Sequence, residues 1–225
     1  MGILEKIVLK NFSVGGKCNL FHHGVVLDCL KKQYLEFEQG NLYGIIGEFG
    51  NGGAALSCGI TGNTNYYEGQ IFIDDKETSI EYLAKNSWYV GNDLYSSNSK
   101  KFWGSKLRIT KNTIKEQIEY GIQKNNHVLD FCAVQNLFNL SNERVNRNID
   151  YVSGERWKAS VAIGFANGRS IFCYPWFNSR DIDHLEEQLT CTITSLLDFG
   201  CIVIIPTTQK TNIEKIFNKA HRVLL

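Results

Sequence analysis

The chain has 225 residues, of which 43% are hydrophobic and 21% are charged, so it is long enough to bury a core in one globular domain. Its 24 Lys and Arg residues nearly balance 23 Asp and Glu residues, and the net charge of +1 gives no strong overall field that would favour nucleic acid or an acidic membrane as a partner. Seven cysteines without a C-x-x-C pair indicate a reducing compartment. No run of about 18 apolar residues occurs and charges interrupt the N-terminal apolar residues, so we expect neither a membrane span nor a secretory signal.

The N-terminal part of the chain shows the alternation of β-strands. Residues 3–10 alternate loosely, and residues 33–38 alternate cleanly with Leu35 and Phe37 on one face, which predicts half-exposed antiparallel strands. The stretch between them, with glycines at 15, 16 and 24, is expected to be a loop. Its adjacent His22 and His23 do not favour a metal site, because neighbouring side chains of an extended segment point apart.

A glycine-rich loop follows a buried strand near the middle of the N-terminal half. The continuous apolar run 42–46 predicts a strand buried on both faces, glycines follow at 47, 50, 52 and 53, and residues 54–60 are expected to be helical. This layout is typical of the phosphate-binding pattern G-x-x-x-x-G-K-[ST], whose glycines bring backbone N–H groups to phosphate oxygens. Gly47 and Gly52 fit its fixed glycines, but Gly53 stands in place of the lysine and Ala54 in place of the hydroxyl.

The middle of the chain predicts a short strand and then helices. Residues 68–75 read as a turn and a strand, and residues 87–93 as a short strand that breaks at a glycine. Residues 94–104 are polar and are expected to form an exposed loop, while residues 113–122 and 128–140 have the apolar spacing of amphipathic helices. We therefore expect a largely helical insert over about 94–150.

The C-terminal part returns to alternating helices and buried strands. Ser153 is the expected N-cap of a helix that carries Trp157, Val161 and Phe165 on one face. Buried strands are expected at 170–173, 201–205 and 221–225, with a helix at 185–197. The alternation predicts an α/β fold with a parallel, helix-covered sheet and a ligand beyond the carboxyl ends of its strands.

The order and spacing of these features resembles the ATP-binding cassette (ABC) nucleotide-binding domain over essentially the whole chain. Residues 47–55 resemble its Walker A loop, 68–75 its "G-E-I-x-I-D-G" strand, 89–93 its "Y-V-P-Q-D" Q-loop, 152–156 its "L-S-G-G-Q" signature, 171–175 its Walker B "L-L-D-E-P", and 204–209 its "V-T-T-H" switch. The resemblance implies the ABC-type P-loop ATPase fold, with a parallel core sheet, an N-terminal antiparallel β sub-part and a helical insert. It implies a single ABC-like domain over 1–225, with core and β sub-part at about 1–93 and 151–225.

The departures from the family pattern remove groups that phosphoryl transfer uses. Gly53 replaces the lysine, and the other replaced positions are Ala54, Ala55, Asn92 for the Q-loop glutamine, Cys173 for the Walker B aspartate, Tyr174 for the catalytic glutamate and Gln209 for the switch histidine. Because neither a metal ligand nor a general base remains at these positions, we expect no catalytic residue, no Mg²⁺ and no hydrolysis at this site.

Two interpretations of the glycine loop remain open. It is either a tight strand-to-helix turn without a ligand, or it keeps a weak contact with ATP or another anion at the helix N-terminus. No cofactor is required in either case. The residual nucleotide-binding set is Gly47, Gly50, Asn51, Gly52, Gly53, Ala54, Ala55 and Asn92.

The signature residues Ser153, Gly154 and Glu155 also allow two interpretations. They either form an ordinary helix cap or, as the resemblance implies, complete the nucleotide site of a second subunit across a dimer. Glu155 weakens the second interpretation, since it would place a carboxylate near a triphosphate. Asp181, Asp183 and His184 follow the Walker B position and are expected to be a solvated helix start rather than a catalytic cluster.

The resemblance implies a non-hydrolysing cassette subunit of an ABC transporter. Its partners would be an intact cassette or a second copy of itself, and a membrane permease on which the helical insert docks. It would lie in the cytoplasm, peripheral at the inner face of the cell membrane, with no nucleic-acid partner. The alternative is a stand-alone regulatory or scaffold protein that uses the cassette fold for protein–protein interaction. An active ATPase with unorthodox residues is disfavoured, because no replaced position supplies a carboxylate or a cation.

Overall fold

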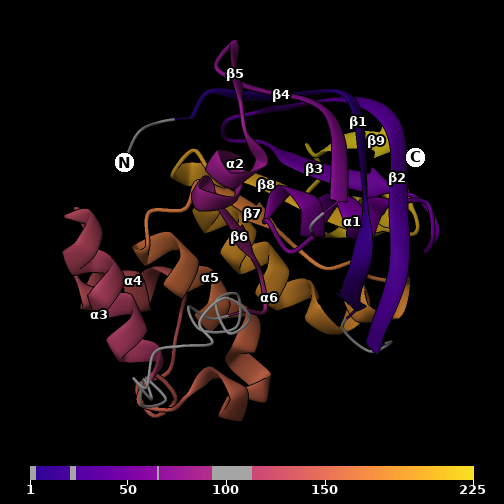
Figure 1. The fold of residues 1–225 in the computed structure, drawn as a ribbon. Coiled ribbons are helices and arrows are strands. Elements are labelled where there is room, and N and C mark those ends of the chain that lie inside the picture. The colour runs from indigo at the N-terminus through magenta and orange to yellow at the C-terminus, as the bar shows by residue number, and fades with distance from the viewer. Residues whose placement is uncertain (1–3, 21–23, 65, 93–112) are drawn as a thin grey trace. The chain divides into compact units, whose positions relative to one another are not determined.

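The structure is a computed structural model that describes residues 4–20, 24–64, 66–92 and 113–225. Figure 1 shows the course of the chain. Contacts between residues divide the chain into two units. The sheet unit comprises Gly2–Tyr89 and Ser170–Leu225, and the helical unit comprises Val90–Arg169. Within the described part of the chain, no helix is long and apolar enough to cross a membrane.

An antiparallel sheet forms the N-terminal part of the sheet unit, with strand order β2-β1-β4-β5. Its strands are β1 (Lys6–Leu20), β2 (Gly24–Glu38), β4 (Tyr66–Ile73) and β5 (Lys76–Thr78). The predicted antiparallel pairing is confirmed, but the predicted loop at Gly15 and Gly16 is wrong, because these residues pair with Cys29 and Asp28 within the β1–β2 ladder. Register shifts between Leu9 and Val14 interrupt the alternation of apolar and polar residues in β1. The second half of this strand therefore could not be predicted from the periodicity of the sequence. His22 and His23 lie outside the described residues.

A parallel sheet forms the rest of the sheet unit, with strand order β6-β7-β8-β3-β9. Its strands are β3 (Leu42–Ile46), β6 (Ser87–Tyr89), β7 (Ile171–Cys173), β8 (Ile202–Thr207) and β9 (His221–Leu224). The predicted parallel core is confirmed, because every neighbouring pair in this sheet runs parallel. Strand β3 lies between β8 and β9 and is buried along its whole length, as its unbroken apolar run predicts.

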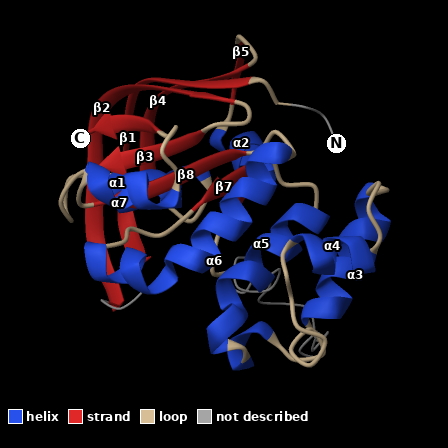
Figure 2. Cartoon of the chain, turned by 180° about the vertical axis from the view of Figure 1, so that it is seen from behind, coloured by secondary structure: helices blue, strands red, loops and turns tan. Residues whose placement is uncertain are grey.

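The helices of the sheet unit are α1 (Gly53–Ile60), α2 (Ile80–Asn86), α6 (Ser179–Asp198) and α7 (Lys210–Ile216). Helix α1 is buried at every residue and contacts β1 and β2 of one sheet and β8 of the other (Figure 2). Its residues allow this burial, since none is charged and most are small. Helices α6 and α7 pack on the parallel sheet, and α2 and α7 were not predicted because each is only two turns long.

The helical unit contains α3 (Ile114–Asn125), α4 (Phe131–Leu137) and α5 (Arg156–Ala166), with the 3₁₀ turns η1 (Ile149–Tyr151) and η2 (Ser153–Glu155) before α5. Helix α5 packs on α3 and α4, and its Phe165 ring lies edge-on to Phe138. The unit therefore extends past the insert expected at about 94–150 and includes α5. The loop predicted at 94–104 lies outside the described residues.

Candidate functional site

The glycine loop lies at the carboxyl end of β3 and continues into α1. Gly50 and Gly52 have left-handed backbone angles, with φ of 99° and 101°, which favour glycine. A Cβ atom on Gly52 would come within 2.6 Å of the Leu30 Cα atom and 2.8 Å of the Cys29 carbonyl oxygen on β2. Glycine is therefore required at position 52 by its conformation and by the close approach of β2.

The first turn of α1 is closely packed at position 53, where the phosphate-binding pattern has its lysine. A Cβ atom on Gly53 would come within 2.9 Å of the Cβ atom of Pro206 on β8, and the rigid proline ring cannot rotate away. Ala54 and Ala55 are fully buried. Of the remaining loop residues, Gly50 and Asn51 are exposed and Gly47 is half-buried.

Asp28 on β2 holds the N-terminal end of α1 through its carboxylate. Its Oδ1 atom accepts a hydrogen bond from the Gly52 N–H at 3.0 Å, and its Oδ2 atom accepts one from the Ala55 N–H at 2.9 Å. Asp28 is 5% exposed, and its Oδ1 atom also accepts from the Cys29 N–H at 3.0 Å. Asp28 was not predicted as a site residue, although it is a lone carboxylate within an apolar stretch of the sequence.

Aromatic side chains cover the start of the glycine loop. The indole N–H of Trp176 donates to the Gly47 carbonyl oxygen at 3.1 Å. Phe49 lies edge-on to Trp176 with the ring centroids 5.7 Å apart. Trp176 is buried and Phe49 is partly exposed. The loop backbone between β3 and α1 therefore contacts Trp176 on one side and is open to solvent on the other. Neither Trp176 nor Phe49 was predicted as a site residue.

Cys173 and Tyr174, at the carboxyl end of β7, are buried and uncharged. Burial raises the pKa of the Cys173 thiol well above its ordinary value of 9, and the nearby Cys58 adds to the shift. Burial also raises the pKa of Tyr174, against a smaller opposite effect of its hydrogen bond with Thr192 at 3.3 Å. Both groups stay protonated at neutral pH, so neither provides a negative charge for a metal ion or a base for a water molecule.

The residues after β8 and at the start of α6 make structural contacts. Gln209 is exposed, and its Nε2 atom donates to the Ser179 Oγ atom at 2.8 Å. Asp181 forms a capping box with Asn178 at the start of α6 and is buried, so the expectation that it is solvated is wrong, since its carboxylate caps the helix. Asp183 is exposed and pairs with Lys215 on α7, and His184 is exposed.

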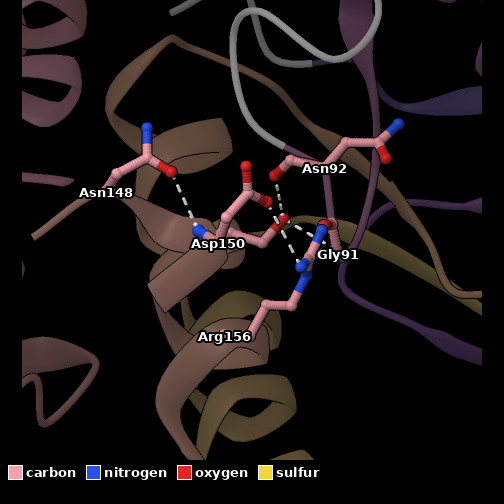
Figure 3. A network of polar contacts seen from close by, with 6 residues as sticks. Gly91, Asn92, Asn148, Asp150 and Arg156 are labelled. Atoms are coloured by element: carbon pink, nitrogen blue, oxygen red, sulfur yellow. Dashed lines mark hydrogen bonds and ion pairs between the residues drawn. The ribbon is translucent and has the colours of Figure 1, made fainter. Parts of the chain in front are cut away.

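Asn92 belongs to a polar network within the helical unit (Figure 3). Its carbonyl oxygen accepts from the Ser160 Oγ atom at 2.6 Å, and the Ser160 Oγ atom accepts from the Gly91 N–H at 2.8 Å. The Arg156 Nε atom donates to the Gly91 carbonyl oxygen at 3.1 Å, and its Nη1 atom pairs with Asp150 at 3.4 Å. The side-chain amide of Asn92 points away from this network in Figure 3, so the network fixes the backbone of Asn92 and leaves its amide outside.

The signature residues form the 3₁₀ turn before α5. Ser153 was expected to be the N-cap, but Glu155 occupies that position because η2 precedes the helix. The Glu155 carboxylate accepts from the backbone N–H and the Oγ atom of Ser141, each at 3.2 Å, and lies 3.5 Å from the Arg144 Nη1 atom. Ser153 and Gly154 are exposed, so the turn presents the serine while its carboxylate is bound within the unit.

In the part of the chain that the structure describes, no group of three or more His, Cys, Asp or Glu side chains could hold a metal ion.

The sequence profile of the ABC transporter family matches residues 30–174, which is more than half of the chain. The chain belongs to the ABC transporter family. No relative among curated proteins matches it. Among solved structures, a putative ABC transporter ATP-binding protein from Pyrococcus furiosus is similar over 98% of this chain and 97% of its own, with 12% identity and a TM-score of 0.63. The bacterial ABC transporter cassette MJ0796, solved as a dimer, is similar over 97% of this chain and 94% of its own, with 16% identity and a TM-score of 0.61.

The ABC cassette fold of this chain brings most of the predicted site residues to one edge of the parallel sheet. The Walker A loop follows β3, the Walker B residues end β7, and the switch residue Gln209 follows β8. Asn92 and the signature residues belong to the helical unit. The geometry adds Asp28, Trp176 and Pro206 to the predicted set, because each contacts the Walker A loop from a distant part of the chain.

Proposed function

We propose that this chain is a non-hydrolysing ATP-binding-cassette subunit that pairs with an intact cassette and a membrane permease at the inner face of the cell membrane. The observation that carries the proposal is the packing at the catalytic positions. Gly53 packs against Pro206, while Cys173 and Tyr174 are fully buried and uncharged, so the Walker positions supply neither a cation nor a metal ligand nor a base.

The magnitude of these losses favours the absence of turnover. Phosphoryl transfer depends on positioned charge around the transferred group, and removal of a single stabilising group commonly costs a factor of about 10² to 10³ in rate. Loss of the lysine, the metal ligands and the base removes several such groups from one site. The expected rate is therefore that of uncatalysed hydrolysis.

The intact fold supports a role for the surfaces of the protein. The chain keeps both sheets and the helical unit, and its signature turn exposes Ser153 while Arg144 and Ser141 bind the Glu155 carboxylate. Because that carboxylate is neutralised within its own unit, it is a smaller obstacle to a triphosphate than the sequence predicts. We propose that Ser153 faces ATP held by the intact loop of the partner cassette, as the dimer of a similar cassette suggests.

Two measurements test the proposal. The purified chain is assayed for Mg²⁺-dependent ATP hydrolysis, with Gly52→Ala as the variant that deforms its own loop, and the expected turnover of both is at background. Turnover that disappears in Gly52→Ala would contradict the proposal. The chain is then co-expressed with an intact ABC cassette and an ABC permease from its own organism. We expect co-purification and ATP turnover that depends on this subunit, whereas a stable chain that binds neither protein would favour the stand-alone scaffold.

A further inference from the structure

The Asp28 carboxylate occupies two of the backbone donors that this loop could offer to a phosphate group. Free N–H groups at the start of a helix following a glycine loop are what such a loop offers to phosphate oxygens. In this chain the N–H groups of Gly52 and Ala55 both point at Asp28, at 3.0 and 2.9 Å, and the two bonds use one oxygen each. The carboxylate therefore spans the first turn of α1 as an oxyanion ligand would.

Strand pairing fixes the position of Asp28. Asp28 is 5% exposed and lies opposite Gly16 in the β1–β2 ladder, one residue before the stretch of β2 that touches Gly52. A third N–H group, from Cys29, also donates to its Oδ1 atom. Charge-assisted hydrogen bonds of this kind are about twice as strong as those between neutral groups, so the carboxylate is held firmly.

A phosphate approaching this loop meets two obstacles. The N–H donors of Gly52 and Ala55 are already taken, and the negative charge of Asp28 repels a second anion in a buried site. Displacing the carboxylate would leave it buried without its donors, which is costly. Strand β2 thus supplies an anion of the protein itself to the N-terminus of α1, in the place of a ligand.

We infer that Asp28 is an internal substitute for phosphate, and that it closes the Walker A loop of this chain to nucleotide phosphate groups. The inference rests on the proposed function and deepens it. It explains how the Walker A loop of a non-hydrolysing subunit is kept free of nucleotide. It chooses between the two interpretations of the loop, since it predicts that the wild-type chain binds no phosphate there. The ligand class excluded is a polyphosphate, and pyrophosphate is a suitable probe.

The test measures pyrophosphate binding and thermal unfolding of the isolated wild-type chain and its variants at matched ionic strength. Asp28→Ala removes the carboxylate, and Asp28→Asn removes its charge while keeping its volume. The matched control is Asp74→Asn, because the Asp74 Oδ1 atom also accepts from two backbone N–H groups, those of Glu5 at 2.9 Å and Lys6 at 2.8 Å, away from the loop.

We expect Asp28→Ala to bind pyrophosphate at least about tenfold more tightly than the wild type, since the N–H groups of Gly52 and Ala55 both become available. Asp28→Asn should also bind it more tightly than the wild type, because the repelling charge is gone although its amide oxygen still accepts from one N–H group. Asp28→Ala should lower the unfolding midpoint by about 3–8 °C in chloride, and pyrophosphate should restore part of the loss. The wild type and Asp74→Asn should show no midpoint shift with pyrophosphate.

The inference is overturned if the Asp28 variants bind pyrophosphate no more tightly than the wild type, or if pyrophosphate raises the unfolding midpoint of the wild type. Asp28→Asn decides the matter should Asp28→Ala not fold. This test involves neither ATP turnover nor partner binding. Failure of the Asp28 inference therefore does not contradict the proposed pairing with an intact cassette, and failure of that pairing does not change the pyrophosphate result.

Discussion

A lysine placed at position 53 tests whether the Walker A loop lost its cation for a structural reason. The Cβ atom of Gly53→Lys would lie 2.9 Å from the Cβ atom of Pro206, closer than such atoms come in folded proteins. Overpacking of this kind costs about 1–3 kcal/mol, and the better helix propensity of lysine over glycine returns about 0.7 kcal/mol. We expect a net loss of about 1 kcal/mol and an unfolding midpoint about 2–4 °C lower.

The assay is calorimetric unfolding of a double-mutant cycle between positions 53 and 206. Pro206→Gly should reduce the cost of Gly53→Lys, because it removes the Cβ atom that the new Cβ atom meets. Asn51→Lys is the control, since it adds the same charge at an exposed loop position and should leave the midpoint nearly unchanged. A Gly53→Lys chain as stable as the wild type, or a cycle without coupling, would refute the argument from packing.

Two further predictions concern function and pH. Combining Ser153→Ala with Gly154→Trp should reduce ATP turnover of the assembled complex. The subunit should stay folded, because both positions are exposed on the signature turn. Unchanged turnover in a complex shown to be assembled would contradict the proposal that Ser153 contributes to a nucleotide site shared with the partner cassette. Because burial raises the pKa of Tyr174 above its ordinary value of 10, its neutral form contributes stability that is fully present below pH 10 and is lost as the pH rises further. The unfolding midpoint of the wild type should therefore fall more steeply above pH 10 than that of Tyr174→Phe, and equal slopes would contradict this.

Restoring the Walker A chemistry alone is expected to leave the protein inactive. Gly53→Lys with Ala54→Ser would supply a cation and a hydroxyl, but Cys173 and Tyr174 would still provide neither a metal ligand nor a base. The measurement is Mg²⁺-dependent ATP hydrolysis, with the wild type as the control. Substantial turnover by the double variant would show that the Walker B losses matter less than the structure indicates.

The sequence predicted the elements whose hydrophobic pattern is unbroken. The apolar run Leu42–Ile46 forms the fully buried strand β3, and the capping residue Thr113 starts α3 where the apolar spacing of residues 113–122 begins. The long β1–β2 hairpin was only half predicted, because the register shifts in β1 and the left-handed Asn11 break the alternation on which such a prediction depends.

The candidate site divides in the same way. The sequence by itself determined which chemical groups stand at the Walker positions, and hence that the loop has no lysine and the end of β7 no carboxylate. Only the tertiary structure decided what fills the loop in their place. Asp28, Trp176 and Pro206 lie on β2, after β7 and on β8, and they reach the loop through strand pairing and side-chain packing between segments far apart in the chain. Such contacts leave no periodic signal in the sequence, because they depend on the register of whole strands rather than on local spacing.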